Sequence, residues 1–309
     1  MVSSSELNAA LPQGDAQAVD EWLDRLNVRL SRTSTASRLA GGQSKAAVYL
    51  VARGWERYVL KVTTSDRWRA QALRELQFYQ DVAPSCPLPV PALLASTVVQ
   101  EGICLLMSAH GQRVSATDWS KDQWIYAAAQ AGELHRHGQS LEPPDLVRRV
   151  NQPDPEAIGQ AATAWIKLGH PEIADYLPSL LVEVTRALIQ APMTLIHGDC
   201  HVDNLLIHDG GELVWVDWQE VSAGAGPEDL ALLWQRAEFD GARPPRAAMT
   251  AAYIAGLGTM LDGSVEQLML AAELRLLLLE WPHFLPYGYS QQQQTMLRRL
   301  HKARQEWVN

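Results

Sequence analysis

The sequence predicts an α+β fold with two lobes, a small antiparallel β-sheet lobe followed by a larger and mostly helical one. Apolar, β-prone runs joined by glycine turns occupy the first third of the 309 residues. After that third, apolar residues recur mainly at helical spacing. We therefore expect one lobe over residues 1–107 and the other over 115–309, with a hinge at 108–114.

The first lobe is expected to be a five-stranded antiparallel sheet with one packed helix, preceded by a loose leader over residues 1–17. The predicted elements are a short amphipathic helix at about 19–30, strands within 33–62 that include 47–51 and 58–62, a helix at 66–82, and strands at 92–99 and 103–107.

The second lobe is expected to be helical apart from one hairpin. The predicted helices cover 122–137, two or three segments of 153–190, 249–261, 265–280 and 291–307. A loop over 224–231 should end at a helix start, where Asp229 could cap exposed N–H groups.

Polar residues surround the predicted hairpin, in which two apolar runs are joined at Asp209-Gly210-Gly211. Asn204 stands just before its first strand and Asp217 at the end of its second, while Asp199 lies in the loop that leads in. Mg²⁺ prefers hard oxygen ligands and keeps water and phosphate oxygens in its shell. Asn204 and Asp217 therefore suit Mg²⁺, which leaves Asp199 to orient a hydroxyl, as in phosphoryl transfer.

Two motifs carry a family resemblance, namely His197-Gly198-Asp199-x-x-x-x-Asn204 and Asp217-Trp218-Gln219. They resemble the catalytic segment of the aminoglycoside phosphotransferase and choline kinase-like family, small-molecule kinases with a protein-kinase-like fold. The resemblance implies that Asp199 is the catalytic base and that Asn204 and Asp217 hold Mg²⁺. It also implies that Asp229, in Asp229-Leu230-Ala231, braces the catalytic loop as a structural residue. The resemblance covers about residues 41–231. Trp218 departs from the Phe of the protein-kinase motif, and without an activation-loop signature we expect no protein substrate.

A nucleotide site is expected in the first lobe. Lys61 lies in an apolar strand and needs a partner. In kinases such a lysine grips the phosphates and is held by a helix glutamate, which here would be Glu75; the alternative for Glu75 is a solvated helix face. The glycine-rich turn with Gly42 and Ser44 could approach the phosphates.

The resemblance implies further contacts to ATP or GTP at the hinge. Met107 would line the base pocket, and the Ser108 carbonyl and the His110 amide would bond the purine edge.

The amino-acid composition indicates which kinds of partner molecule and which compartment suit this chain. A formal charge of −9, from 26 basic and 35 acidic residues, argues against nucleic acid. Three irregularly spaced cysteines form neither a disulfide framework nor a zinc pattern, which suits a reducing cytoplasm. The longest uncharged run, 84–100, holds four prolines and is no membrane helix. We expect a cytoplasmic monomer or homodimer.

The acceptor is expected to be a small molecule with a hydroxyl. Acidic residues follow the metal aspartate, namely Glu228, Glu238, Asp240, Glu273 and Glu280. Carboxylates in a pocket would favour an amine-bearing acceptor such as an aminoglycoside, unless Glu273 and Glu280 only mark the wet face of a buried helix. Choline, an amino alcohol or a sugar are the alternatives. Trp281 and Tyr287 would serve packing, or face a ligand.

Two other classes of function are less well supported. A metallophosphoesterase could use the spacing Asp199-x-His201, but His208 and His283 stand isolated in the sequence. A pseudokinase would lack the base or a metal ligand, and this chain has both.

Overall fold

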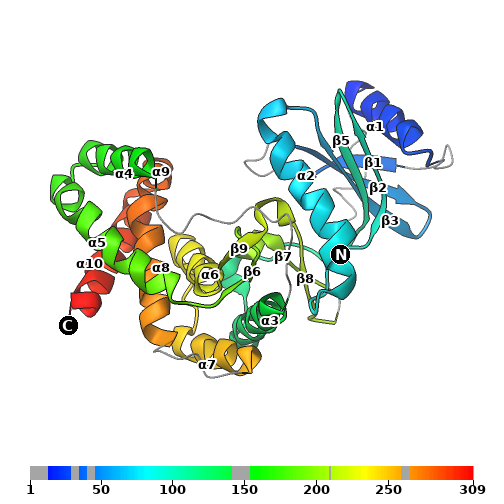
Figure 1. Cartoon of the computed structure of the whole chain (residues 1–309). Coiled ribbons are helices and arrows are strands. Elements are labelled where there is room, and N and C mark those ends of the chain that lie inside the picture. The colour runs from blue at the N-terminus through cyan, green and yellow to red at the C-terminus, as the bar shows by residue number, and fades with distance from the viewer. Residues whose placement is uncertain are drawn as a thin grey trace. The chain divides into compact units, whose positions relative to one another are not determined.

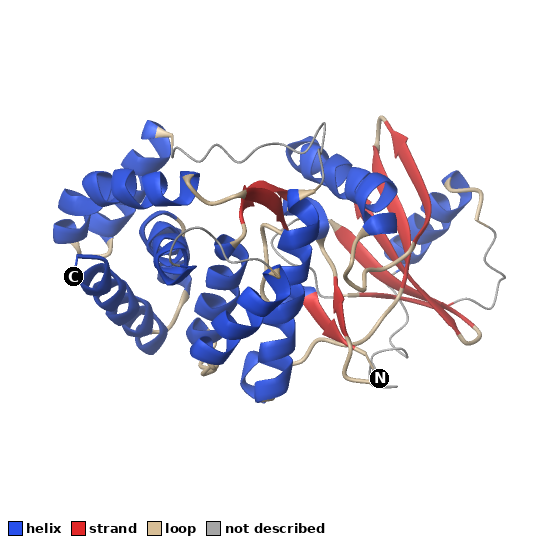
Figure 2. Cartoon of the chain, turned by 60° about the horizontal axis from the view of Figure 1, so that its bottom comes forward, coloured by secondary structure: helices blue, strands red, loops and turns tan. Residues whose placement is uncertain are grey.

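The computed structural model describes residues 13–28, 35–39, 46–140, 154–208, 210–258 and 265–308. The chain divides into two compact units. The first comprises Met1–Arg113 and Leu205–Glu220, and the second comprises Val114–Asn204 and Val221–Asn309. Strands dominate the first unit and helices the second, which confirms the α+β fold (Figures 1 and 2). No helix of the described residues has the length and apolar character to cross a membrane.

The first unit is built on a five-stranded antiparallel sheet of order β1-β2-β3-β5-β4, as predicted. Its strands are β1 (Thr35–Arg38), β2 (Ala47–Arg53), β3 (Glu56–Thr63), β4 (Leu93–Val99) and β5 (Gly102–Ser108). In the register, Lys61 of the central strand β3 lies between Val48 of β2 and Leu105 of β5. Lys61 therefore sits in the middle of the sheet, where no edge is open to water.

Both faces of this sheet carry a helix, whereas only one packed helix was predicted. Helix α1 (Gln13–Arg25) places Val19, Trp22 and Leu23 in a core with Leu60 and its neighbours. Because side chains alternate along a strand, Lys61 points to the opposite face, where α2 (Arg69–Gln77) lies. The predicted helix 19–30 thus begins and ends earlier than expected, inside the segment taken as a leader.

The helix predicted at 66–82 is divided into three parts. A 3₁₀ turn, η2 (Asp66–Trp68), precedes α2, and a π-helical turn, η3 (Phe78–Val82), follows it. π-Helical turns are rare and often occur at functional sites. Here the turn carries the buried Phe78, which contacts the segment after the hairpin.

The predicted hairpin consists of β7 (Leu205–Ile207) and β8 (Leu213–Trp215), and it belongs to the first unit. The Trp215 amide donates to the Pro89 carbonyl oxygen at 2.9 Å. Gln112 and Ile207 exchange two backbone hydrogen bonds of 3.0 and 2.9 Å. These bonds fix the hairpin to the segments on either side of β4 and β5, and with it the residue that follows β8, Asp217.

The second unit holds the remaining helices and a two-stranded ribbon, β6 (Met193–Ile196) with β9 (Ser222–Ala225). Its helices are α3 (Lys121–Gln139), α4 (Pro155–Lys167), α5 (Pro171–Ile189), α6 (Pro227–Phe239), α7 (Arg246–Leu257), α8 (Val265–Leu279), α9 (Trp281–Phe284) and α10 (Ser290–Val308). The helix start expected in 224–231 is present, but the loop before it is shorter than predicted, because β9 ends at Ala225 and α6 begins at Pro227. Small residues let β9 lie close to β6, since a Cβ on Gly224 would meet the Ile196 side chain.

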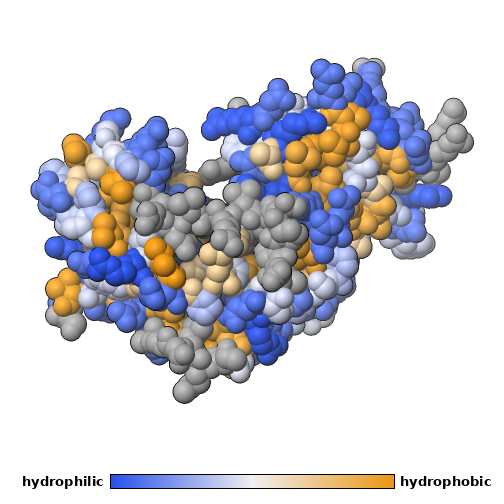
Figure 3. Space-filling model, viewed as in Figure 1, coloured by the Kyte–Doolittle hydropathy of each residue, from blue (hydrophilic) through white to orange (hydrophobic). Residues whose placement is uncertain are grey.

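Large exposed apolar side chains are scattered over the described residues. Trp55 lies at the β2–β3 turn, and Tyr287 and Tyr289 follow α9. Figure 3 shows apolar and hydrophilic residues interspersed on the face that it presents. Scattered residues of this kind are normal and need no partner to explain them.

Candidate active site

Lys61 is the centre of a buried charge cluster in the first unit. Its Nζ atom lies 2.6 Å from Glu75 Oε2 and 2.6 Å from Asp217 Oδ1. Burial lowers the pKa of Lys61, but the Glu75 and Asp217 carboxylates more than offset this and raise it above its usual value. Lys61 is therefore charged at neutral pH. The pairing expected between Lys61 and Glu75 is present.

Glu75 is only 1% exposed, so the solvated helix face considered for it is wrong. Burial raises the pKa of Glu75, the Lys61 charge lowers it, and the net shift is upward. A buried carboxylate without a partner is costly, and Lys61 is the cation that compensates for it.

Asp217 follows β8 with a left-handed backbone conformation, φ 65°. Asp tolerates this region better than most residues, yet it remains uncommon and is found at functional sites more often than elsewhere. The carboxylate is 26% exposed, with Oδ1 on Lys61. The carboxylate thus combines a fixed position with access from solvent.

Two contacts from α2 and η3 hold the segment that carries Asp217. The Trp218 ring stacks on Phe78, with 3.9 Å between centroids and 9° between planes. Arg74 Nη1 donates to the Gln219 carbonyl oxygen at 3.0 Å and to Glu220 Oε2 at 3.2 Å. The segment after the hairpin is therefore fixed by the same helix that supplies Glu75.

The predicted base-contacting residues lie at the end of β5. Met107 is buried, and the Ser108 hydroxyl accepts from the Ala92 amide at 2.8 Å and contacts His110 Nε2 at 2.7 Å. Burial and the neighbouring His208 lower the pKa of His110, which favours the neutral ring. The proposed bonds from the Ser108 carbonyl and the His110 amide to a purine stay predictions. Gly42 and Ser44 lie outside the described residues.

In the second unit, the loop that carries Asp199 is braced by a buried carboxylate. Asp229 Oδ2 accepts from the His197 amide at 2.7 Å, and Asp229 Oδ1 accepts from the Gly198 amide at 2.9 Å. Asp229 Oδ2 also lies 3.1 Å from His135 Nε2, and His135 Nδ1 lies 2.9 Å from the Tyr253 hydroxyl. Asp229 makes no side-chain cap bond at the start of α6. It instead braces the loop of Asp199, as the family resemblance implied.

Asn204 and Asp199 lie together in this loop. Asn204 Nδ2 donates to the Asp199 carbonyl oxygen at 2.9 Å and to Asp199 Oδ2 at 3.2 Å. Because both hydrogen bonds to Asp199 use Nδ2, the Asn204 amide oxygen Oδ1 faces away from Asp199. Asn204 directly precedes β7, so one continuous segment runs from Asp199 through the hairpin to Asp217.

His201 is a further residue of this loop, which the sequence suggested only as a metal ligand. Its Nε2 lies 3.5 Å from Asp199 Oδ2 and 3.2 Å from Asn204 Nδ2. Burial raises the pKa of Asp199, but the hydrogen bond to His201 and electrostatic interactions with His201, His197 and Arg236 outweigh it, and the pKa falls to about 2. Asp199 is therefore ionised throughout the neutral range.

The acidic pocket predicted for the acceptor is wrong for three of its five members. Buried carboxylates need cations, and arginines of the neighbouring helices supply them. Glu273 pairs with Arg246 and Arg299. The same Arg246 bonds Glu238 through its Nε at 2.7 Å. Glu228 pairs with Arg275, whereas Glu280 is exposed.

The two aromatic residues considered beside the acceptor differ in burial. Trp281 is 2% exposed, and its Nε1 donates to Gln235 Oε1 at 2.6 Å, which is a packing role. Tyr287 is 89% exposed.

Each unit offers an oxygen donor of the hard kind that Mg²⁺ prefers. Asp217 in the first unit has a carboxylate, and Asn204 in the second unit has an amide oxygen. Among the described residues, no group of three or more His, Cys, Asp or Glu side chains could hold a metal ion by itself.

Comparison with a family model places residues 35–263 in the phosphotransferase enzyme family APH. The chain belongs to this family. It is therefore a small-molecule kinase, and the phosphoesterase alternative is set aside. The comparison with curated proteins gave no significant match.

Solved structures with the same fold cover nearly the whole chain. The amicoumacin kinase in complex with AMP-PNP, Ca²⁺ and Ami matches with TM-score 0.66 and 13% identity over 96% of each chain. The microcompartment-associated aminopropanol kinase matches with TM-score 0.63 and 15% identity, over 93% of this chain and 94% of that one. The choline kinase LicA from Streptococcus pneumoniae matches with TM-score 0.62 and 14% identity, over 94% and 99%. At these identities the likeness shows the fold alone.

Proposed function

We propose that this chain transfers the γ-phosphoryl group of ATP or GTP to a hydroxyl of an amine-bearing small molecule, such as an aminoglycoside. The observation that carries the proposal is the braced loop of Asp199. Its carboxylate is ionised, partly exposed and hydrogen-bonded to Asn204, on a backbone fixed by Asp229. Such a carboxylate can orient a hydroxyl and accept its proton as the bond to phosphorus forms.

The nucleotide would be bound by residues 1–107 and the hinge 108–114. Lys61, held by Glu75, would neutralise charge on the phosphates. Gly42 and Ser44 would approach the phosphates, and Met107, Ser108 and His110 would contact the base.

Mg²⁺ would be held by Asn204 and Asp217. When bound, the ion supplies positive charge at the phosphate oxygens. Asp217 is suited to this because its neighbours Trp218 and Gln219 are fixed by α2 and η3, so its oxygens need little rearrangement. Lys61 would then share Asp217 with the ion.

We expect residues 115–309 to bind the acceptor. The carboxylates of Asp203 and Asp240 support an acceptor that bears an amine. Burial raises the pKa of Asp240, and the Asp203 charge raises it further, although Arg236 and His201 oppose them. A nearby cationic group on a ligand would relieve the repulsion between these carboxylates. Aminopropanol and choline, named for two similar structures, both carry such a nitrogen. Choline, another amino alcohol or a sugar is the alternative acceptor.

A reducing compartment such as the cytoplasm suits the three cysteines, which are free thiols, Cys104 and Cys200 being buried. We propose a monomer or homodimer there.

A coupled assay of nucleotide consumption tests the proposal, with aminoglycosides, other antibiotics, amino alcohols and sugars as candidate acceptors and Asp199→Ala as the blank. We expect turnover with amine-bearing compounds. Asp203→Asn combined with Asp240→Asn should raise KM for them more than it lowers kcat. Turnover of neutral sugars alone would contradict the amine-bearing acceptor and leave the kinase assignment standing.

A further inference from the structure

The second unit contains a pocket that none of the residues assigned above lines. Its volume is about 470 Å³, which lies within the usual range for small-molecule sites. It is bounded by the start of α3 with the turn before it, and by the loop between α6 and α7. The lining residues are Ala116, Thr117, Trp119, Lys121, Trp124, Gly241, Ala242, Arg243 and Pro245.

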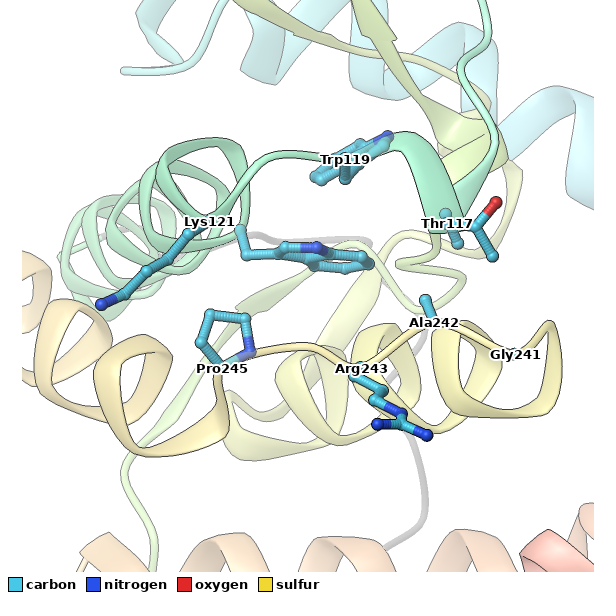
Figure 4. A pocket seen from close by; sticks show the side chains of 9 residues that line it. Thr117, Trp119, Lys121, Gly241, Ala242, Arg243 and Pro245 are labelled. Atoms are coloured by element: carbon cyan, nitrogen blue, oxygen red, sulfur yellow. The ribbon is translucent and has the colours of Figure 1, made fainter.

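The pocket offers an aromatic wall. The rings of Trp119 and Trp124 lie 4.7 Å apart between centroids and are tilted by 43°. Figure 4 shows Trp119 on one side of the pocket and Pro245, Ala242 and Arg243 on the other. Only a small part of each ring is exposed, 6% for Trp119 and 3% for Trp124. Rigid aromatic side chains of this kind bind apolar ligands at little entropic cost.

A buried donor adds to this. The Trp119 side chain is 6% exposed, and its Nε1 atom finds no hydrogen-bond partner among the described residues. A buried indole N–H normally has a partner.

The charges around the pocket favour an anion. Two of the nine lining residues are basic, Lys121 and Arg243, and none is acidic. Both side chains are exposed, and in Figure 4 their charged ends point outward from the pocket, where a carboxylate at its rim could meet one of them. Lys121 is also the first residue of the 19-residue helix α3, whose N-terminus carries partial positive charge. Asp118 and Asp122 flank this segment, and Asp240 directly precedes Gly241, but none of the three lines the pocket.

We propose that this pocket binds a planar, apolar small molecule that carries a carboxylate. The ring system would lie against Trp119, Trp124 and Pro245, and the carboxylate would be bound by Arg243 or Lys121. This site is of opposite charge to the carboxylates Asp203 and Asp240, and its occupation does not depend on the proposed reaction.

Saturation-transfer NMR with 2-naphthoate tests the proposal, with 2-naphthamide and 2-naphthylmethylamine as matched neutral and cationic probes. For a compound of this size we expect saturable binding of 2-naphthoate with a Kd on the order of 1 mM. The neutral amide should bind about fivefold more weakly, since one exposed ion pair contributes up to about that factor. The amine should bind most weakly.

The double variant Lys121→Gln, Arg243→Gln should weaken 2-naphthoate binding by about fivefold or more and leave binding of the amide unchanged. Both side chains are exposed, so the fold should tolerate the changes. The matched control is Arg298→Gln, Lys302→Gln on the exposed face of α10, which should bind like the wild type. Equal binding of all three probes, no saturation, or an unchanged affinity in the pocket variant would overturn the proposal.

Discussion

The indole ring of Trp218 lies face to face with the phenyl ring of Phe78, and both side chains are fully buried. Trp218 directly follows Asp217, whose backbone is in the left-handed region. Phe78 directly follows α2, the helix that carries Glu75. The stacked rings therefore link the segment that carries Glu75 to the segment that carries Asp217, and both of these carboxylates contact Lys61.

Replacing Trp218 should disturb Asp217 through this stack. We expect Trp218→Ala to lose about 3–5 kcal/mol of stability, the usual cost of removing a buried aromatic side chain, and to weaken Mg²⁺-dependent nucleotide binding. Trp218→Phe keeps a ring on Phe78 and should restore most of that binding. Chemical denaturation and nucleotide titration with and without Mg²⁺ measure both effects. Trp55→Ala, at a fully exposed site, is the matched control and should change neither.

The Lys61–Glu75 pair should matter for both stability and turnover. Glu75→Gln removes one partner of a buried ion pair, which costs about 3–5 kcal/mol, and the lower end is expected because Asp217 still faces Lys61. Turnover should fall because Lys61 loses its support. The control is Glu101→Gln in the exposed pair with Arg25, which should leave both quantities unchanged. A stable and fully active Glu75→Gln variant would show that Glu75 does not hold Lys61.

Gly226 should tolerate no side chain, because a Cβ there would lie 2.5 Å from His135 Nδ1 and 2.6 Å from the Tyr253 hydroxyl. Gly226→Ala should therefore destabilise the fold by about 1–3 kcal/mol, as overpacking does, and displace the bonds through which His135 positions Asp229. In α4, Gly159 has open space around it. Gly159→Ala should stabilise the protein by about 0.5–1 kcal/mol. Thermal unfolding of both variants compares them, and equal loss of stability would argue against a specific brace.

The ionisation of Asp199 gives a prediction about pH. Its pKa in the folded chain lies at about 2, below the ordinary 3.8. A lowered carboxylate pKa stabilises the fold above the ordinary value, and this contribution is lost as pH falls toward about 2. The stability difference between wild type and Asp199→Asn should therefore shrink across that window. Because His201 contributes most of the lowering, with smaller contributions from His197 and Arg236, His201→Ala should raise the Asp199 midpoint in an NMR titration. An unchanged midpoint would assign the shift to other groups.

Much of the fold could be predicted because the spacing of apolar residues within a single strand or helix already indicates that element. The strands around Lys61, the helix with Glu75 and the hairpin before Asp217 each follow from apolar spacing and glycine turns. The motif around Asp199 also indicated the family, through its resemblance to the catalytic segment of these kinases, and the family model confirms the family. The roles of Asp199, Asn204 and Asp217 stay predictions.

The predictions that were wrong or missing concern side chains whose partners lie at other places in the sequence. The arginines that neutralise Glu228, Glu238 and Glu273 lie 8 to 47 residues away, and no local pattern links them. The strand β9 was missed because Ser222–Ala225 lacks large apolar residues. It is held by its close approach to Ile196. Tyr253 gave no signal either, since its bond to His135 spans 118 residues.

The most direct test of the account separates phosphoryl transfer from nucleotide binding in two variants. Asp199→Ala should lower turnover by about 10²–10⁴-fold, the usual contribution of a general base, while Mg²⁺-dependent nucleotide affinity stays near that of the wild type. Asp217→Asn should instead weaken that affinity, because a neutral amide replaces a charged ligand on a divalent ion. Turnover of Asp199→Ala within about tenfold of the wild type, on an acceptor that the wild type phosphorylates, would contradict Asp199 as the catalytic base.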